Sequence, residues 1–189
     1  QGTRRPRLTG ALAHGSVVAE ILTLEYADGK PLSDVGWGGR ATAEDLRNVG
    51  TLHPLELSII ARPRPLALAN AGKIATAIRD ALSDGPPLTV LVGHDTEIAN
   101  IAGLLGVHWS IPPGFADDEP APGGALMFDL VEDSGGNRFV RSFYRAQSLD
   151  QIRELDPHDA VSVPLTPSGC DTERCPFDVF ASRLTGPAD

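Results

Sequence analysis

The stretch LTVLVGHDTEIANIAGLLGVHW, residues 88–109, decides the fold class of this chain. It opens with five consecutive apolar or β-branched residues, Leu88–Val92, which is the pattern of a strand buried on both faces in a parallel sheet. After Gly93 and His94, apolar residues recur at helical spacing from Asp95 onward. The stretch therefore predicts a buried strand that leads directly into a helix, with its most polar pair at the junction.

Four helical segments are predicted before this strand, because apolar residues recur at helical spacing in each. They are residues 8–30, a segment that opens at Thr42, a segment that opens at Pro54, and residues 65–85. Thr9 is the expected N-cap of the first helix. Thr42 and Asp45 form the pattern of a capping box, and Gly85 is expected to end the last helix. Residues 31–40 are predicted to be a loop.

The pattern changes after residue 109. A long segment rich in Pro, Gly and Asp predicts a loop, and two strand-like runs joined by the turn sequence SGGN predict a hairpin. The expected elements are a loop over 110–124, strands over 125–133 and 138–146, and short helices over 148–155 and 176–184. This order indicates an α/β fold with an antiparallel edge on a mixed sheet. Few strands precede the buried one, so the sheet is expected to be small or completed from outside this chain.

Composition excludes some classes of partner. The chain has 189 residues, a net charge of −9 and no basic stripe, which argues against nucleic acid. No window of the sequence is long and apolar enough to cross a membrane. We therefore expect that the chain does not bind nucleic acid and does not associate with a membrane. A small anionic substrate is not excluded, because it responds to the local field.

The two cysteines lie five residues apart in the loop-like sequence SGCDTERCPF. A local disulfide between Cys170 and Cys175 is the favoured interpretation, and two free thiols are the alternative. A zinc site would need two further ligands, and no other His or Cys lies nearby in the sequence. A disulfide would place the protein in an oxidising compartment.

The junction of strand and helix is a candidate ligand site. In open α/β sheets, ligands bind beyond the carboxyl ends of strands, where helices begin. The amides and the dipole of the new helix favour an anion there. The alternatives are that Asp95 is a plain N-cap and that His94 is an ordinary polar residue.

The sequence GHDTEIANIAGLLGVHW, followed by PAPGGALMFDL, resembles the C-terminal signature of the histidine acid phosphatases. It is most similar to the bacterial periplasmic branch of phytases and glucose-1-phosphatases. Further motifs fall in that family's order: LTGA and EI within residues 8–21, GWG at 36–38, LH at 52–53, Arg62, and LTPSGC near the end. Because the ordered set covers nearly the whole chain, it is far more specific than the His-Asp pair alone.

The resemblance implies a phosphoglycerate-mutase-like α/β fold, with a mixed central sheet flanked by helices. It implies that residues 1–87 form part of a helical subdomain and its flanking helices. Residues 88–189 would be the C-terminal part of the α/β phosphatase domain. It further implies a periplasmic or secreted protein that needs no cofactor and no metal.

The family's mechanism is implied in the same way. A nucleophilic histidine forms a phosphohistidine, and an aspartate protonates the leaving alkoxide. Asp95 matches that proton donor and His94 matches the phosphate-binding histidine beside it. Thr96, Arg62 and Glu20 are the remaining candidates for phosphate or substrate binding.

Each of these three has a plain structural alternative: the first turn of a helix for Thr96, a cation at a helix C-terminus for Arg62, and a solvated helix face for Glu20. Glu97 departs from the Asn that is usual in this branch. An added negative charge near the phosphate would put a highly anionic substrate such as phytate in doubt. The alternative is that the side chain points away and is stabilised by the helix N-terminus.

The family's nucleophile motif, Arg-His-Gly-x-Arg-x-Pro, is absent from this sequence. The nearest string, LAHGSVV at residues 12–18, has Ala13 in place of the arginine, and His14 is predicted to be an ordinary helix residue. We therefore expect a C-terminal portion that is inactive alone. Its partner would be the N-terminal half that carries the nucleophilic histidine.

The expected substrate is a small phosphate ester, an inositol or sugar phosphate. The alternative is a non-catalytic module that binds a phosphate ligand or serves a structural role. A metal-dependent hydrolase is disfavoured because the histidines have no ligand spacing.

Overall fold

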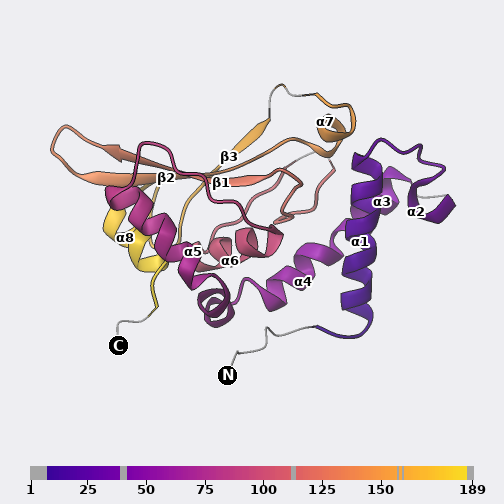
Figure 1. Ribbon diagram of the computed structural model, residues 1–189, viewed down its shortest axis with the longest axis horizontal. Coiled ribbons are helices and arrows are strands. Elements are labelled where there is room, and N and C mark those ends of the chain that lie inside the picture. The colour runs from indigo at the N-terminus through magenta and orange to yellow at the C-terminus, as the bar shows by residue number, and fades with distance from the viewer. Residues whose placement is uncertain (1–7, 39–41, 112–113, 157, 159, 187–189) are drawn as a thin grey trace. The chain divides into compact units, whose positions relative to one another are not determined.

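A computed structural model describes residues 8–38, 42–111, 114–156, 158 and 160–186 of the chain (Figure 1). The described residues fall into two compact units. One unit comprises Gln1–Ile60, Trp109–Gly124 and Arg145–Ser162, and the other comprises Ala61–His108, Ala125–Tyr144 and Val163–Asp189. The predicted division between residues 87 and 88 concerned parts of a longer protein, and it stays a prediction.

The first unit is helical. Its elements are α1 (Ala11–Ala27), α2 (Val35–Gly38), α3 (Ala43–Gly50), α4 (Leu52–Ile60) and α7 (Leu149–Arg153). Helix α1 packs against each of the other four. At its C-terminal end, Tyr26 donates from its hydroxyl to Asp150 Oδ1 at 2.8 Å, and the Arg153 guanidinium stacks on the Tyr26 ring at 4.4 Å. Arg153 also donates to the backbone carbonyl of Lys30 at 2.8 Å, so α7 holds the end of α1.

The second unit combines helices with strands. Its helices are α5 (Arg64–Asp84), α6 (Asp95–Leu105) and α8 (Phe177–Arg183). The strands of the sheet are β1 (Ala125–Glu132), β2 (Arg138–Ala146), β3 (Val161–Leu165) and β4 (Arg174–Pro176). The order is β1-β2-β3, and β4 also pairs with β2. Strands β2 and β4 are antiparallel, with Val140 opposite Cys175.

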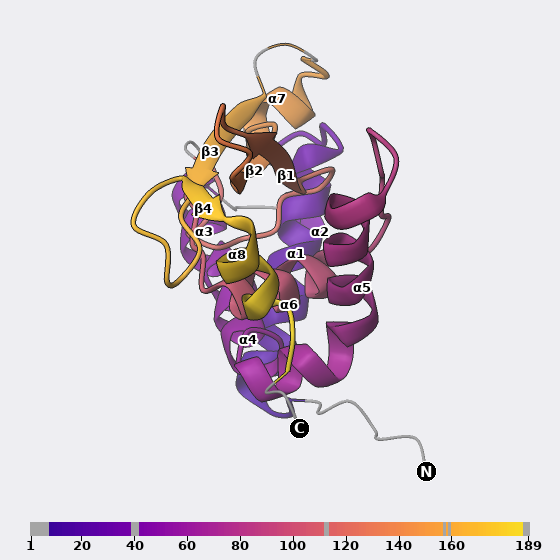
Figure 2. The same cartoon turned by 90° about the vertical axis from the view of Figure 1, so that its left-hand side faces the viewer.

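One face of the hairpin strands is covered by helices. Helices α5, α6 and α8 lie on the same side of β1 and β2 (Figures 1 and 2). Val140 and Tyr144 of β2 are fully buried, while Arg141 between them is exposed, which is the period-2 alternation of a sheet with one buried face. Phe128 of β1 meets Phe180 of α8 edge to face, with ring centroids 5.2 Å apart.

Helix α6 is the most deeply buried helix segment of this unit. Ile101, Leu104 and Leu105 are each at most 2% exposed. Complete burial of a side chain of this size stabilises a fold by about 1.5–3 kcal/mol. The helix ends at Gly106, which has a φ of 65°, the left-handed conformation that glycine adopts without strain. The buried apolar side chains in the C-terminal half of α6 therefore hold the helix in the core of this unit.

A glycine sets the close approach of α6 to the start of α5. A Cβ atom on Gly103 would lie 2.2 Å from the backbone oxygen of Arg62 and 2.6 Å from its Cα. We expect Gly103→Ala to lower the free energy of unfolding by about 1–3 kcal/mol, because backbone atoms must move apart. Urea unfolding followed by circular dichroism measures this change.

The matched control is Gly72→Ala in α5, where an added Cβ meets no atom within 4 Å. There, alanine should stabilise by up to about 1 kcal/mol, because it restricts the unfolded chain and favours the helix. Equal effects of the two substitutions would contradict the close-packing argument.

Most of the predicted elements are confirmed, with small shifts at their ends. Thr42 and Asp45 form the expected capping box of α3: Thr42 Oγ1 accepts from Asp45 N at 3.1 Å and Asp45 Oδ2 accepts from Thr42 N at 2.8 Å. The hydrogen bonds from the Thr42 backbone and hydroxyl lower the pKa of Asp45. Gly85 caps α5, and the hairpin and both late helices are present.

Two local predictions are wrong, and two strands were missed. The N-cap of α1 is Gly10 and not Thr9, and the predicted loop 31–40 contains the short helix α2. Strands β3 and β4 were not predicted. Both are short, and the hydrogen bonds that make them strands come from β2, far away in the sequence.

The strand predicted at Leu88–Val92 is also not formed. The segment has no regular secondary structure and pairs with no strand in the part of the chain that the structure describes. Leu88, Val90 and Val92 are 78%, 74% and 93% exposed. The α/β fold class is confirmed. The described sheet is small and antiparallel, because Leu88–Val92, which was predicted to be a parallel strand, has no neighbouring strand to pair with among the described residues.

Candidate functional site

The polar pair lies at the first turn of α6, as predicted. His94 is the N-cap residue, with extended backbone, and Asp95 is the first residue of the helix. The alternative in which Asp95 is itself the N-cap is therefore wrong. The Glu97 carboxylate accepts the His94 backbone N–H at 3.0 Å, as in the second half of a capping box. The His94 side chain is 88% exposed, and its Nδ1 lies 3.6 Å from Glu97 Oε2.

Thr96 holds the carboxyl group of Asp95. Asp95 Oδ1 accepts from the Thr96 hydroxyl at 2.8 Å and also from the Thr96 backbone N–H. Both residues are half-buried. Asn100, one turn further on and 1% exposed, donates its side-chain amide to the Thr96 carbonyl at 2.6 Å. A chain of hydrogen bonds thus fixes Asp95 from the buried side of the helix.

The electrostatics of this turn limit what can bind there. The positive end of the helix dipole favours an anion, but Asp95 and Glu97 contribute two carboxyl groups to the first turn. A phosphoryl group beside ionised carboxylates is repelled by them. Binding therefore requires cations beyond this junction, protonation of Asp95, or both.

Arg62 does not lie with this group. Its guanidinium donates to the Val107 carbonyl and lies 3.3 Å from His108 Nδ1, both just beyond the C-terminal end of α6. Asp95 is at the opposite end of this 11-residue helix. At about 1.5 Å per residue the two ends are about 15 Å apart. The geometry therefore places the Arg62 guanidinium beyond the C-terminus of α6, whereas the structural alternative placed it at the end of its own helix, α4.

Glu20 and His14 both lie on α1 of the helical unit, and both are exposed. For His14 this agrees with the prediction of an ordinary helix residue. Glu20 belongs to a different unit from His94 and Asp95. Its proposed contact with substrate stays a prediction.

The predicted disulfide between Cys170 and Cys175 is present. Cys175 lies on β4 and is fully buried opposite Val140 of β2. The bond therefore ties the loop before β4 to the sheet. Within the described ranges, no group of three His, Cys, Asp or Glu side chains could hold a metal ion. In that same part of the chain, no helix has the length and apolar character needed to cross a bilayer.

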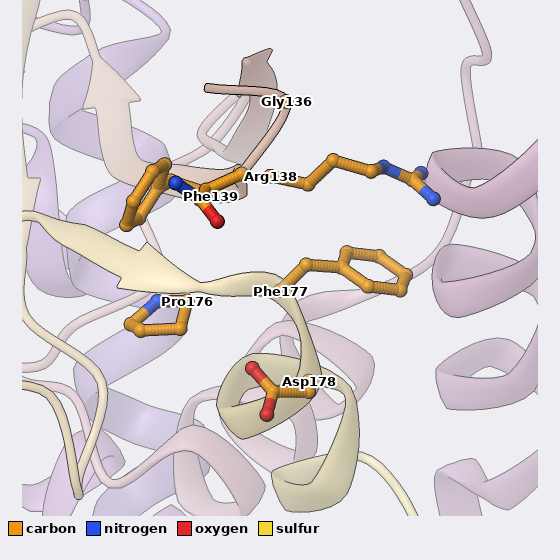
Figure 3. Close-up of a pocket in the computed structure, with 7 residues that line it drawn as sticks. Gly136, Arg138, Phe139, Pro176, Phe177 and Asp178 are labelled. Atoms are coloured by element: carbon orange, nitrogen blue, oxygen red, sulfur yellow. The ribbon is translucent and has the colours of Figure 1, made fainter. Parts of the chain in front are cut away.

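A separate hollow of about 490 Å³ lies beside the hairpin turn (Figure 3). It is lined by Gly136, Asn137, Arg138, Phe139, Pro176, Phe177 and Asp178. The Arg138 guanidinium stacks on the Phe177 ring at 4.5 Å and donates to the Leu82 carbonyl at 2.8 Å. Because its arginine binds the end of α5, and because it contains no residue of the His94–Asp95 turn, this hollow is a feature of packing.

Two polar arrangements were not anticipated from the sequence. Arg64 donates to three backbone carbonyls, those of Leu104, Arg183 and Thr185, at 3.2, 2.9 and 2.7 Å. His53 lies buried against Glu119, with Nδ1 and Oε1 2.8 Å apart. In the sequence, Arg64 stands between two prolines and His53 between Leu52 and Pro54, and neither setting identifies the partner of the side chain.

Two curated relatives cover most of this chain. It is 29% identical over 181 residues to the phytase AppA of Escherichia coli (strain K12), a match that spans 87% of this chain and 41% of that protein. It is also 29% identical over 191 residues to the glucose-1-phosphatase of Salmonella typhimurium, spanning 94% of this chain and 46% of that protein. No family model matches the chain.

Solved structures of phytases share the fold. The phytase from Citrobacter braakii superposes with a TM-score of 0.81 at 26% identity, and covers 94% of this chain and 49% of that one. Hafnia alvei phytase in complex with tartrate gives a TM-score of 0.81 at 30% identity over the same shares of the two chains.

These likenesses confirm the resemblance found in the sequence: the homologues of this chain are phytases and glucose-1-phosphatases of the histidine acid phosphatase family. Within it, the chain is similar to bacterial phytases and glucose-1-phosphatases, which are phosphatases. It spans less than half the length of each of these relatives, which is consistent with a C-terminal portion of them.

Proposed function

We propose that this chain supplies the proton-donor part of the active site of an acid phosphomonoesterase, with Asp95 as the acid. The observation that carries the proposal is the half-buried carboxyl group at the first position of α6, fixed by Thr96 and adjacent to an exposed imidazole. A positioned carboxylic acid can protonate a departing alkoxide. The resulting carboxylate can then accept a proton from an attacking water.

The neighbouring residues take supporting roles. His94, with an exposed ring, donates to the phosphoryl oxygens and stabilises the charge that develops on them. Thr96 positions Asp95, because its hydroxyl donates to the carboxylate. Arg62 is left out of the proposal because its guanidinium is bound at the far end of α6.

The nucleophile belongs to the remainder of the protein. The chain spans 41% and 46% of the two bacterial relatives named above. We assign to the unspanned portion a histidine that attacks phosphorus, so that the P–O bond of the ester breaks and a phosphohistidine forms. Asp95 gives its proton to the leaving oxygen. Water then releases phosphate and restores the histidine, which completes a two-step displacement.

The proposed substrate is a small phosphate monoester, an inositol or sugar phosphate. The names of the relatives support this class. The disulfide supports an oxidising compartment, the periplasm or the exterior. The net charge of −9 and the carboxyl groups of α6 disfavour nucleic acid.

The direct test compares this chain alone with the longest polypeptide that contains it in its source, using p-nitrophenyl phosphate at acidic pH. We expect turnover from the longer polypeptide and none above background from the 189-residue chain, because the nucleophile motif is absent from it. Isothermal titration with inorganic phosphate serves as the second readout. Robust turnover by the pure chain would refute the half-site proposal, and phosphate binding with no turnover from either form would favour a non-catalytic module.

A further inference from the structure

Glu97 is the charged side chain in the first turn of α6 to which the proposed function gives no role. Its carboxylate accepts the His94 backbone N–H at 3.0 Å, and its Oε2 lies 3.6 Å from His94 Nδ1. The side chain is 23% exposed and lies against Gly93, where an added Cβ would come within 3.2 Å of the Glu97 Cβ. The Glu97 carboxylate is therefore held in a defined place, directly beside the imidazole.

We propose that Glu97 is a specificity-determining residue, which selects phosphate esters that carry one phosphoryl group and neutral hydroxyl groups over esters that carry several phosphates. The inference rests on the proposed function, in that it places the reacting phosphoryl group at His94 and Asp95. It goes further, because the proposed function leaves sugar phosphates and inositol phosphates equally open.

The position of Glu97 directs its effect to the groups that surround the reacting phosphoryl group. Nδ1 is the nitrogen of His94 on the Glu97 side, so Nε2 is the nitrogen that reaches a phosphoryl oxygen. With a hydrogen bond of about 2.8 Å from Nε2, the Glu97 carboxylate and that oxygen are at most roughly 8 Å apart. This is beyond hydrogen-bond distance, but it is close enough to affect a substituent of the same sugar or inositol ring.

A carboxylate distinguishes a neighbouring hydroxyl group from a neighbouring phosphate. It only accepts hydrogen bonds, so a hydroxyl group can donate to it, whereas a phosphate has a charge of the same sign and is repelled. At an exposed site, the repulsion between one carboxylate and one further phosphate corresponds to roughly a tenfold loss of binding. Glu97 also occupies the His94 N–H, which is a helix-terminal donor that a second phosphate would otherwise use.

Substitution of Glu97 in the longest polypeptide that contains this chain tests the selection. The readout is the ratio of kcat/KM for phytate to kcat/KM for glucose 1-phosphate, because effects on the shared phosphoryl group cancel in this ratio. We expect the unsubstituted protein to favour glucose 1-phosphate, and Glu97→Gln to raise the ratio about tenfold. Glutamine can accept the same N-cap N–H in a capping box, so the start of α6 should be preserved.

Two further substitutions serve as controls, and both should leave the ratio unchanged. Glu97→Asp keeps the charge, and Asp45 of α3 shows that an aspartate at the same helix position reaches the N-cap N–H, at 2.8 Å. Glu132→Gln removes an equal charge from an exposed residue of β1. A second measurement needs no variant: glucose 1-phosphate should inhibit the hydrolysis of p-nitrophenyl phosphate at a lower concentration than phytate does.

Isothermal titration of the same two ligands into these proteins separates this inference from the proposed function. Turnover with a ratio that Glu97→Gln leaves unchanged, or that Glu97→Asp or Glu132→Gln raises equally, rejects only the specificity role of the Glu97 charge. A binding ratio that shifts with Glu97→Gln in a protein without turnover rejects only the proposed proton-donor role. A preference of the unsubstituted protein for phytate overturns the inference, and so does the absence of binding of both ligands.

Discussion

Asp95→Asn in the complete enzyme is expected to lower kcat/KM for an alkyl phosphate by about 10²–10⁴-fold, which is the usual contribution of a general acid. The loss for p-nitrophenyl phosphate should be much smaller. Nitrophenolate leaves without a proton, whereas an alkoxide is a poor leaving group until it is protonated. Asparagine keeps the size of the side chain and its place in the first turn of α6, so folding should be preserved.

The comparison depends on kcat/KM, which reports the steps up to formation of the phosphoenzyme. A change in kcat alone would also include hydrolysis of the intermediate, in which Asp95 is proposed to act as the base. Asp178→Asn is the control, since Asp178 is also an acidic residue in the first turn of a helix, α8, but is exposed and lies outside the His94–Asp95 turn. Equal losses for alkyl and nitrophenyl esters would show that Asp95 is not the proton donor.

Arg64→Ala is expected to lower the free energy of unfolding by about 3 kcal/mol, because three carbonyls lose a charged donor in a partly buried site. The carbonyl groups of Leu104, Arg183 and Thr185 lie at the C-terminal ends of α6 and α8, where the helix dipoles are negative. One guanidinium therefore joins two helix ends to the first residue of α5. Denaturant unfolding measures the loss.

Arg64→Lys should recover only part of this loss, since an ammonium group keeps the charge but does not reproduce the planar set of donors. Arg79→Ala, which removes an arginine that is 36% exposed and hydrogen-bonds to the adjacent Asp80, should change stability by less than about 0.5 kcal/mol. If Arg64→Ala behaved like Arg79→Ala, the three hydrogen bonds would be shown not to stabilise the fold.

The elements predicted correctly from the sequence are those whose signals are local. The capping box of Thr42 and Asp45, the end of α5 at Gly85 and the hairpin through SGGN each depend on residues within a few positions of one another. Short-range hydrogen bonds and backbone preferences are sufficient to specify such elements. The ordered motifs likewise indicated the class of the homologues, because they are a property of the sequence.

The pairing of Cys170 with Cys175 was also favoured correctly, since the two residues share one short loop. The strands β3 and β4 could not be predicted in the same way. Each is short, and each becomes a strand only when β2 supplies its hydrogen bonds. Long-range pairing of this kind leaves little trace in a short local sequence.

The sequence by itself determined most of the helices, the hairpin, the resemblance to the histidine acid phosphatases and the polar pair at the start of α6. Only the tertiary structure decided that Arg62 lies at the opposite end of α6 from Asp95, that Arg64 binds three helix-terminal carbonyls, and that Leu88–Val92 is exposed. The physical reason is that a helix can satisfy its backbone within its own segment, whereas a strand needs a neighbour and an arginine needs acceptors. Both of these come from residues distant in the chain.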